Sequence, residues 1–182
     1  MEPELSNIEV TLLSIVNENP SYAYEIDKTI DARDMRRWIR IGVASIYQVL
    51  KRLKDKGLVD SQREKEGRMP ERNRYYITEF GKRALSKAAK KRLSSLEWYY
   101  LDLNIGLEAS DLLTMKEIAD CLNQRLIRVR ANKKRVKEIY GAERNNTLKR
   151  KAIIKNLINF RAAEENFLQE ILQKITRDIR SY

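Results

Sequence analysis

The chain has 182 residues, of which 42% are hydrophobic, so it is long and apolar enough to form a folded core. Its 37 Lys and Arg against 26 Asp and Glu give a formal net charge of +11, which favours a polyanionic partner, such as nucleic acid or an acidic membrane face, over a role in solubility alone. The absence of His and the single Cys121 exclude His-based catalytic triads, disulfides within the chain and the usual zinc sites, so no metal ion or cofactor is expected.

Two short helices are predicted at the N-terminus. Apolar residues recur at helical spacing over residues 5–17 and indicate a first helix with one buried stripe. Ser21 is expected to cap a second helix over residues 21–30. The connector over residues 31–41 is charged, and two large apolar side chains, Trp38 and Ile41, are expected to anchor it.

Residues 42–57 are predicted to form a third helix of about four turns. At 100° per residue, its apolar residues fall on one side: Ile46, Val49, Leu50 and Leu53. The other side carries small, polar and cationic side chains, as in a helix that enters the major groove of DNA. An ordinary amphipathic surface helix has the same pattern, so this helix alone leaves both interpretations open. The candidate DNA contacts on it are Ser45, Tyr47, Gln48, Lys51 and Arg52.

A hairpin with a basic loop is predicted after the third helix. Residues 58–63 and 75–78 are typical of strands, and the charged loop over residues 64–74 joins them. Three helices followed by such a hairpin are the element order of a winged helix-turn-helix domain. The arginines of the tip are expected to reach phosphates or the adjacent minor groove: Arg68, Arg72 and Arg74.

A helical domain over residues 93–182 is expected to follow this DNA-binding domain of residues 1–92. The segment 93–113 is the most apolar of the chain and has to bury against something. Residues 111–140 and about 146–180 show apolar stripes at spacings of three and four, which predict an antiparallel helical hairpin about 45 Å long. One hairpin cannot bury both stripes and the apolar segment, so we expect a homodimer; folding back on the N-terminal domain is the alternative.

Three parts of the chain resemble motifs of the PadR family of transcriptional regulators. Tyr-Ala-Tyr-Glu-Ile at residues 22–26 resembles the His-Gly-Tyr-Glu-Ile-like segment that opens the second helix of the family. Residues 44–53, followed by Gly-Leu-Val at 57–59, resemble its recognition helix. Gly-Arg-Met-Pro at 67–70 and Tyr-Tyr-Ile-Thr-Glu-Phe-Gly at 75–81 resemble its wing.

The departures from these motifs are few. Ala23 and Ala44 replace glycines, Gln48 replaces a proline, and Met69 adds one residue to the wing. They affect which operator is read and are compatible with the fold.

The resemblance covers both halves of the chain. It implies a mainly α fold and a homodimeric repressor that reads a pseudo-palindromic operator in double-stranded DNA, with half-sites about one helical turn apart.

Individual roles follow for the candidate DNA contacts. Gln48 is the best candidate for base readout, because its amide can pair bidentately with adenine. Lys51 and Arg52 are expected at phosphates or guanine. Tyr22 and Tyr24 either donate hydrogen bonds to the DNA backbone through their hydroxyls or pack within the domain.

The resemblance also implies that a small molecule or stress signal releases the DNA. An effector pocket, if present, is expected at the aromatic segment Trp98, Tyr99 and Tyr100, with Leu101. The favoured alternative is that these side chains are simply the core of the dimer.

A second concentration of positive charge lies in the C-terminal half. Between Arg125 and Lys155 there are twelve Lys or Arg against only Glu138 and Glu143. These cations either form a solvated outer face of the hairpin or contact DNA that flanks the operator.

Two other classes of protein compete with a DNA-binding regulator. One is a dimeric adaptor whose hairpin binds another protein and which binds nucleic acid only non-specifically. The other is an enzyme. This class is disfavoured because the sequence lacks His, a ligand cluster and a phosphate-binding glycine loop.

No apolar run approaches the roughly 20 residues of a membrane span, and the acidic N-terminus is unlike a signal peptide, so a cytoplasmic protein without membrane contact is expected.

Overall fold

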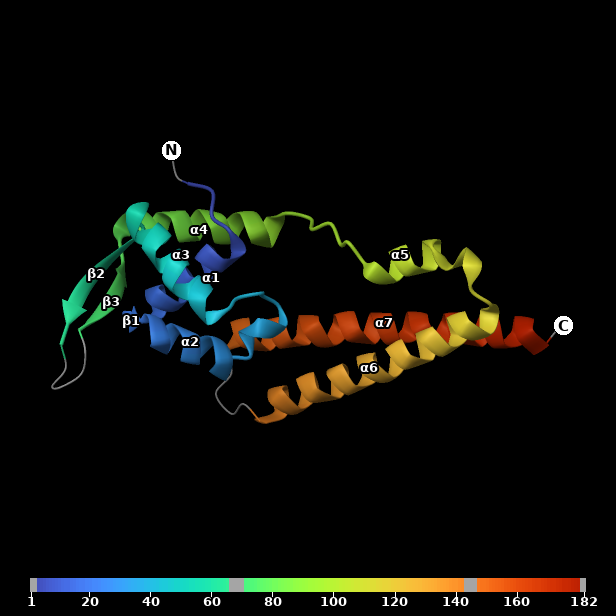
Figure 1. Cartoon of the computed structure of the whole chain (residues 1–182). Helices are drawn as coiled ribbons and strands as arrows, with labels where there is room; N and C mark the ends of the chain where they lie inside the picture. Colours follow the sequence, from blue (N-terminus) through green and yellow to red (C-terminus); the bar gives the residue numbers. More distant parts are fainter. Residues whose placement is uncertain (1–2, 66–70, 143–146, 181–182) are drawn as a thin grey trace. The chain divides into compact units, whose positions relative to one another are not determined.

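A computed structural model of the chain describes residues 3–65, 71–142 and 147–180 (Figure 1). It divides into two compact units, Met1–Trp98 and Tyr99–Tyr182. The predicted boundary between residues 92 and 93 falls inside α4 (Glu79–Ser94), the last helix of the first unit. Within the described ranges, none of the helices combines the length and the apolar character that a membrane crossing requires.

The first unit has the predicted order of three helices, a hairpin and a further helix. Its elements before α4 are α1 (Asn7–Glu18), β1 (Ser21–Tyr22), α2 (Ala23–Ala32), a short 3-10 turn (Met35–Arg37), α3 (Val43–Asp55), β2 (Val59–Glu64) and β3 (Arg72–Ile77). The strands form one antiparallel sheet in the order β1-β3-β2. A mainly helical chain with a winged helix-turn-helix unit was the prediction, and it is confirmed.

The start of α2 differs from the prediction. Ser21 does not cap the helix, because it lies in β1, opposite Tyr75 of β3, and its hydroxyl donates to the Asn19 carbonyl at 2.8 Å. The helix begins two residues later than predicted, where the Tyr22 backbone N–H donates to the Glu25 carboxylate at 3.0 Å. The two-stranded wing of the prediction therefore gains a third, short strand.

Trp38 was wrongly predicted as an apolar anchor of the connector. Its side chain is 42% exposed, while Ile39 and Ile41 on either side of Arg40 are buried in the core of the first unit. The connector is therefore held by two β-branched aliphatic side chains.

The second wing strand is longer than predicted, while the first keeps its predicted length and starts one residue later. β3 begins at Arg72, so Arg72 and Arg74 lie in a strand and not in the loop at the tip. Residues alternate between the two faces of a strand, and with Tyr75 buried, the two arginines lie on the opposite face from it. Arg68 lies outside the described residues.

The apolar side of α3 packs in the core of the first unit, as its periodicity predicted. All four of its apolar residues are at most 1% exposed: Ile46, Val49, Leu50 and Leu53. An ion pair between Lys56 and the buried Glu9 of α1, 2.6 Å apart, ties the end of α3 to the first helix. Burial raises the pKa of Glu9, but the hydrogen bonds from Lys56 and Ser6 outweigh it, so the net shift is downward and the carboxylate stays ionised.

The Leu58 carbonyl joins α3, the wing and α4 at one point. Gly57 has a φ of 67°, which reverses the chain after α3, and Leu58 starts the path into β2. The Leu58 carbonyl accepts the backbone N–H of Thr78 at 3.1 Å, and the Thr78 hydroxyl in turn caps α4 by accepting the N–H of Gly81 at 2.9 Å. A Cβ at Gly81 would lie only 2.0 Å from that carbonyl oxygen.

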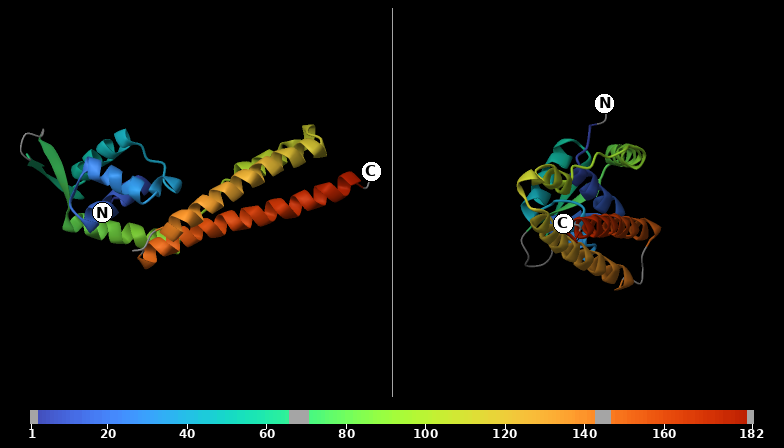
Figure 2. Two further views of the ribbon diagram at one scale, coloured as in Figure 1. Left: turned by 90° about the horizontal axis from the view of Figure 1, so that it is seen from below. Right: turned by 90° about the vertical axis from the view of Figure 1, so that its right-hand side faces the viewer.

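The second unit is a helical hairpin. It comprises α5 (Asp102–Glu108), a 3-10 turn (Ser110–Leu112), α6 (Met115–Ala142) and α7 (Leu148–Arg180). Helices α6 and α7 run side by side in opposite directions in both figures (Figure 1, Figure 2), as predicted. Helix α6 begins four residues later than expected, because Thr114 and Glu117 form a capping pair there.

The core of this hairpin is small. Its buried apolar residues are Leu122, Leu126, Val129, Leu168 and Ile175. Much of the apolar segment 93–113 is exposed in the single chain, with Leu112 96% and Tyr100 91% exposed. Much of the segment that was expected to be buried is thus exposed to solvent among the described residues.

Replacing Gly81 by Ala is expected to lower the free energy of unfolding of the first unit by about 1–3 kcal/mol, because the new methyl group must displace the Leu58 carbonyl or the Ile77 side chain. Urea denaturation followed by circular dichroism measures the change. Gly42→Ala is the control, since a Cβ there meets no atom within 4 Å, and its effect should stay below about 1 kcal/mol. Equal losses in the two variants would contradict the close approach.

Candidate nucleic-acid interface

The outward face of α3 carries the residues predicted to read DNA. Tyr47 is 54% exposed, and Gln48, Lys51 and Arg52 are also exposed, while Ser45 is half-buried at the flank. Their exposure follows from the opposite side of the helix, which is fixed in the core. One helix therefore presents an aromatic, an amide and two cationic side chains to solvent.

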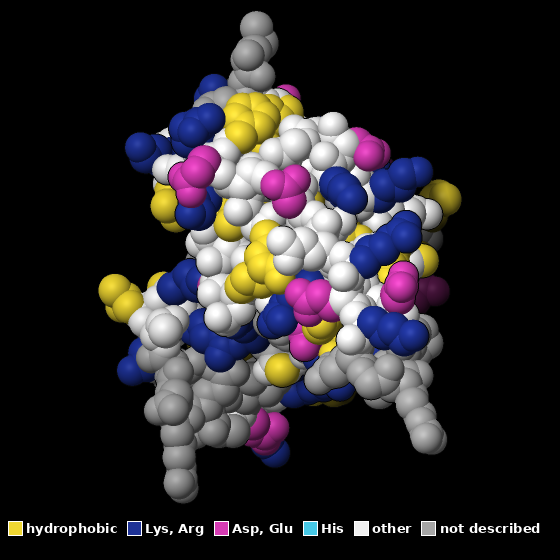
Figure 3. All heavy atoms as spheres, turned by 90° about the vertical axis from the view of Figure 1, so that its left-hand side faces the viewer, with side chains coloured by type: hydrophobic (Ala, Val, Ile, Leu, Met, Phe, Trp, Pro, Cys, Tyr) yellow, Lys and Arg dark blue, Asp and Glu magenta, His cyan; other side chains and the backbone are white. Residues whose placement is uncertain are grey.

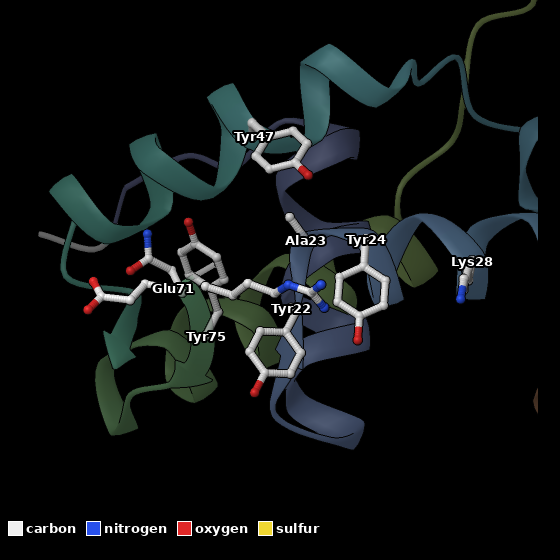
Figure 4. Close-up of a pocket in the computed structure, with 9 residues that line it drawn as sticks. Tyr22, Ala23, Tyr24, Lys28, Tyr47, Glu71 and Tyr75 are labelled. Atoms are coloured by element: carbon white, nitrogen blue, oxygen red, sulfur yellow. The ribbon is translucent and has the colours of Figure 1, made fainter. Parts of the chain in front are cut away.

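A groove of about 750 Å³ lies between this helix, the start of α2 and strand β3. Its lining residues are Tyr22, Ala23, Tyr24, Lys28, Tyr47, Glu71, Arg72, Asn73 and Tyr75. In Figure 4, Tyr47 projects from α3 toward Ala23 at the start of α2, and the rings of Tyr22 and Tyr24 lie alongside each other. The groove therefore connects the predicted groove-reading helix with both tyrosines of the second helix.

Arginines of β3 stack on these two tyrosines. The rings of Tyr22 and Tyr24 are parallel, with centroids 5.7 Å apart and an interplanar angle of 14°. The Arg74 guanidinium lies over the Tyr22 ring at 5.3 Å, and the Arg72 guanidinium over the Tyr24 ring at 5.0 Å. Such cation–π contacts orient a guanidinium without consuming its hydrogen-bond donors. We refer to these four residues as the tyrosine–arginine stack.

Glu64, at the end of β2, lies beside the tyrosine–arginine stack. Its carboxylate accepts hydrogen bonds from the Tyr22 hydroxyl at 2.5 Å and the Tyr76 hydroxyl at 2.9 Å, and it lies 3.6 Å from the Arg74 guanidinium. The hydrogen bonds from Tyr22 and Tyr76, aided by the charge of Arg74, lower the pKa of Glu64. A fixed negative charge therefore stands among the cations of the wing.

The structure brings together four of the ten predicted DNA contacts, from four separate elements. Tyr22, Tyr24 and Arg72 line one groove with Tyr47 of α3. The hydroxyl of Tyr22 is engaged by Glu64, while the hydroxyl of Tyr24 makes only a long contact of 3.4 Å with Glu25.

Three charged residues of this site were missed in the sequence analysis: Lys28, Glu64 and Glu71. Lys28 lies one helical turn after Tyr24, with its ammonium 5.3 Å from the ring centroid. Its position four residues after Tyr24 on a predicted helix could have indicated this contact from the sequence. No local pattern in the sequence indicates the contacts of Glu64, because they depend on how β2 pairs with β3.

In Figure 3, Lys and Arg side chains are spread over the face shown, with hydrophobic and a few acidic side chains exposed between them.

The residues proposed for an effector pocket or dimer core are exposed in the single chain. Trp98, Tyr99 and Leu101 are 81%, 58% and 50% exposed, and the Tyr99 ring meets the Phe160 ring edge-on at 5.3 Å. They do not line the groove beside α3, nor a second hollow of about 410 Å³ around Arg128 in the hairpin.

Part of the basic stretch of the hairpin is neutralised within it. Arg125 contacts Glu164 at 2.6 Å, and Arg130 contacts Glu165 at 2.9 Å, with Lys133 also bonded to Glu165. The hydrogen bonds from Lys133 and Arg130 lower the pKa of Glu165. Across the described residues, no group of three or more His, Cys, Asp or Glu side chains is placed to hold a metal ion.

The first unit is a winged helix-turn-helix domain, a class in which the third helix and the wing form the usual nucleic-acid interface. Residues 12–87 match the family described as the transcriptional regulator PadR-like family. The winged-helix unit of this chain is therefore similar to the PadR-like transcriptional regulators, in agreement with the resemblance of its motifs.

Solved structures share the fold over most of the chain. Bacillus subtilis PadR in complex with operator DNA is 16% identical, with a TM-score of 0.81 over 93% of this chain and 99% of that chain. The protein smu.1604c from Streptococcus mutans UA159 is 21% identical, with a TM-score of 0.65 over 93% and 99%. The PadR-like regulator BC1756 from Bacillus cereus is 15% identical, with a TM-score of 0.69 over 94% and 99%. No protein of curated function matches the sequence.

Replacing Tyr22 by Phe is expected to raise the pKa of Glu64 toward its ordinary value, because the largest of the hydrogen bonds that stabilise its carboxylate is lost. Carbon-13 NMR titration of the glutamate carboxyl groups measures this shift. Tyr24→Phe is the matched control, since that hydroxyl makes no contact with Glu64, and it should leave the titration unchanged. An unchanged Glu64 titration in the Tyr22 variant would contradict the contact.

Proposed function

We propose that the chain is a sequence-specific, DNA-binding transcriptional regulator, and specifically a homodimeric repressor that binds a pseudo-palindromic operator. The observation that carries the proposal is the groove that joins the polar face of α3 to the tyrosine–arginine stack of β1, α2 and β3. The match of residues 12–87 to the PadR-like family and the fold shared with Bacillus subtilis PadR, whose structure was solved with operator DNA, support it. A cytoplasmic location and the lack of enzymatic activity belong to the same proposal.

Selection of bound fragments from genomic DNA tests this function directly. A repressor of this kind enriches a pseudo-palindromic sequence whose half-sites are about one helical turn apart. Retention of fragments without any common sequence would instead support the adaptor, which binds nucleic acid only non-specifically.

The face of α3 is proposed to read bases in the major groove. Ser45, Tyr47 and Gln48 lie toward its N-terminal end, the part of a recognition helix that contacts base edges. Lys51 and Arg52, one turn further, are proposed to contact phosphates or guanine.

Replacing Gln48 by Ala is expected to relax base preference, with a loss of about 1–3 kcal/mol on the operator and little change on scrambled DNA, because a bidentate amide–adenine pair is sequence-specific. Fluorescence anisotropy with both duplexes measures the two affinities. Equal losses on the two duplexes would contradict a readout role for Gln48.

The wing and the start of α2 are proposed to hold the DNA backbone. Arg68, Arg72 and Arg74 contribute the positive charge, and Tyr22 and Tyr24 contribute the rings on which Arg74 and Arg72 stack. Phosphate contacts of this kind are sequence-independent and weaken steeply with salt.

Replacing Arg72 by Ala is expected to weaken binding about equally on all duplexes and to reduce the salt slope of log K by about 0.9, since one phosphate contact is lost. Titrations at several salt concentrations measure the slope. Lys90→Ala on α4 is a control with the same change of charge at an exposed site outside the groove. A slope that Arg72→Ala leaves unchanged would contradict the wing assignment.

Association through the hairpin is proposed because its apolar surface is not covered within one chain. Ile127 is 66% exposed on the side of α6 opposite the buried Leu126 and Val129, and Leu112 and Leu113 are exposed beside the start of that helix. A second copy of the chain is the partner that the two-fold symmetry of a pseudo-palindromic operator requires.

Replacing Ile127 by Glu is expected to shift the protein from dimer to monomer, because burying a carboxylate in an apolar interface is unfavourable. Sedimentation equilibrium measures the mass. Gln62→Glu in β2 makes the same change of charge in the first unit and should leave the dimer intact. A wild-type chain that sediments as a monomer would contradict the dimer, and an unaffected variant would place the interface elsewhere.

A small-molecule effector is also part of the proposal. The structure of Bacillus subtilis PadR in complex with p-coumaric acid supports a small-molecule response for a protein of this fold. For this chain we propose that Trp98, Tyr99 and Leu101 line the effector pocket or the dimer core. Their exposed rings and side chain are available for either role.

A further inference from the structure

We propose that Glu64 is a positioning residue of the DNA-binding surface, whose carboxylate restrains the Arg74 guanidinium and so weakens the attraction of the wing for DNA of any sequence. The inference rests on the proposed function, because it concerns how strongly the same surface binds DNA. It adds a repulsive element to the attractive contacts of this site.

The carboxylate of Glu64 is held in place by contacts on both oxygens. Its Oε2 accepts the Tyr22 hydroxyl at 2.5 Å and lies 3.6 Å from Arg74, while its Oε1 accepts the Tyr76 hydroxyl at 2.9 Å. Glu64 ends β2 directly opposite Arg72 of β3. Its negative charge therefore stays beside both arginines of the tyrosine–arginine stack.

The surrounding charges give this carboxylate its effect. The cations at the groove are Lys28, Arg72 and Arg74, and the other acidic groups are Glu71, which lines the groove, and Glu25, whose carboxylate accepts the Tyr22 backbone N–H. Glu64 pairs with one of the stacked arginines, Arg74. Removing the charge of Glu64 takes this carboxylate partner away from the Arg74 guanidinium, so its attraction to phosphate increases.

A negative charge in a phosphate-binding surface acts on the phosphate contacts of any DNA. These contacts supply most of the non-specific binding, so one available cation fewer lowers that binding directly. Binding to the operator also draws on base contacts of α3, which do not depend on Glu64. The carboxylate therefore lowers the affinity for both kinds of DNA by a similar factor and leaves base readout unchanged.

The charge of Glu64, and not only its hydrogen bonds, is the quantity to test. Glu64→Gln keeps the size of the side chain and an oxygen that accepts one tyrosine hydroxyl, but it removes the negative charge. Glu79→Gln is the matched control. This substitution makes the same change of charge at a site beyond the opposite end of the β2–β3 hairpin, where Glu79 pairs with Lys82.

Fluorescence anisotropy of the full chain with a scrambled duplex, at several salt concentrations, measures the effect. Glu64→Gln should strengthen non-specific binding by up to about eightfold at 0.1 M salt and steepen the slope of log K by about 0.9 for each wing in contact. Glu79→Gln should change neither by a comparable amount. The gain on the operator should be of similar size, because the wing contacts phosphates in both complexes, and a gain on only one of the two duplexes would contradict an effect through phosphate contacts.

A second variant covers the case in which Glu64→Gln does not fold. Arg74→Gln should change the non-specific salt slope only slightly in the wild-type background, since Glu64 already matches that charge. In the Glu64→Gln background it should abolish the gain. A full loss of one phosphate contact on Arg74→Gln alone would overturn the inference.

The outcomes separate the inference from the proposed function. A wild-type chain that binds duplex DNA, together with an unchanged slope in Glu64→Gln, overturns the role of Glu64 and leaves the DNA-binding function standing. A wild-type chain that binds no duplex overturns the function and the inference with it.

Discussion

The hydrogen-bonded junction at the Leu58 carbonyl is the constraint on which the first unit depends. This one oxygen accepts the Thr78 N–H at the end of the wing and lies against Gly81 in the first turn of α4. The left-handed Gly57 just before it sets the direction in which the chain leaves α3. Helix α3, the wing and α4 are thus held close to one another. The geometry of the candidate DNA-binding groove follows from this junction.

The candidate site is a product of that arrangement, since no single element contains it. Helix α3 contributes the polar face, the start of α2 contributes two stacked rings, and β3 contributes the cations that lie on them. The rings limit the motion of the guanidinium groups, so less entropy is lost when the arginines meet phosphates. Tyr22 links a cation and an anion at this site. Its ring carries the Arg74 guanidinium, and its hydroxyl donates to the carboxylate of Glu64, which lies beside Arg74.

Periodicity was sufficient to predict the helices and the buried side of α3, because aliphatic side chains at helical spacing share one face, and that face packs into the core. It failed for residues whose secondary structure depends on pairing between segments that are far apart in the sequence. Ser21 looks like a helix cap, yet it extends the sheet because Tyr75 lies opposite. Arg72 and Arg74 looked like loop residues, and their place in β3 depends on the register with β2. The role of Glu64 follows from the same register, so no local pattern signals it.

The adjacent carboxylates Glu164 and Glu165 have a consequence for the hairpin. Apolar stripes at spacings of three and four would still meet if α7 slid past α6 by one turn of about 5.4 Å. Such a slip would take Glu164 away from Arg125 and Glu165 away from Arg130, leaving half-buried carboxylates without their cations. The ion pairs therefore select one alignment of two helices whose hydrophobic contacts alone would permit several.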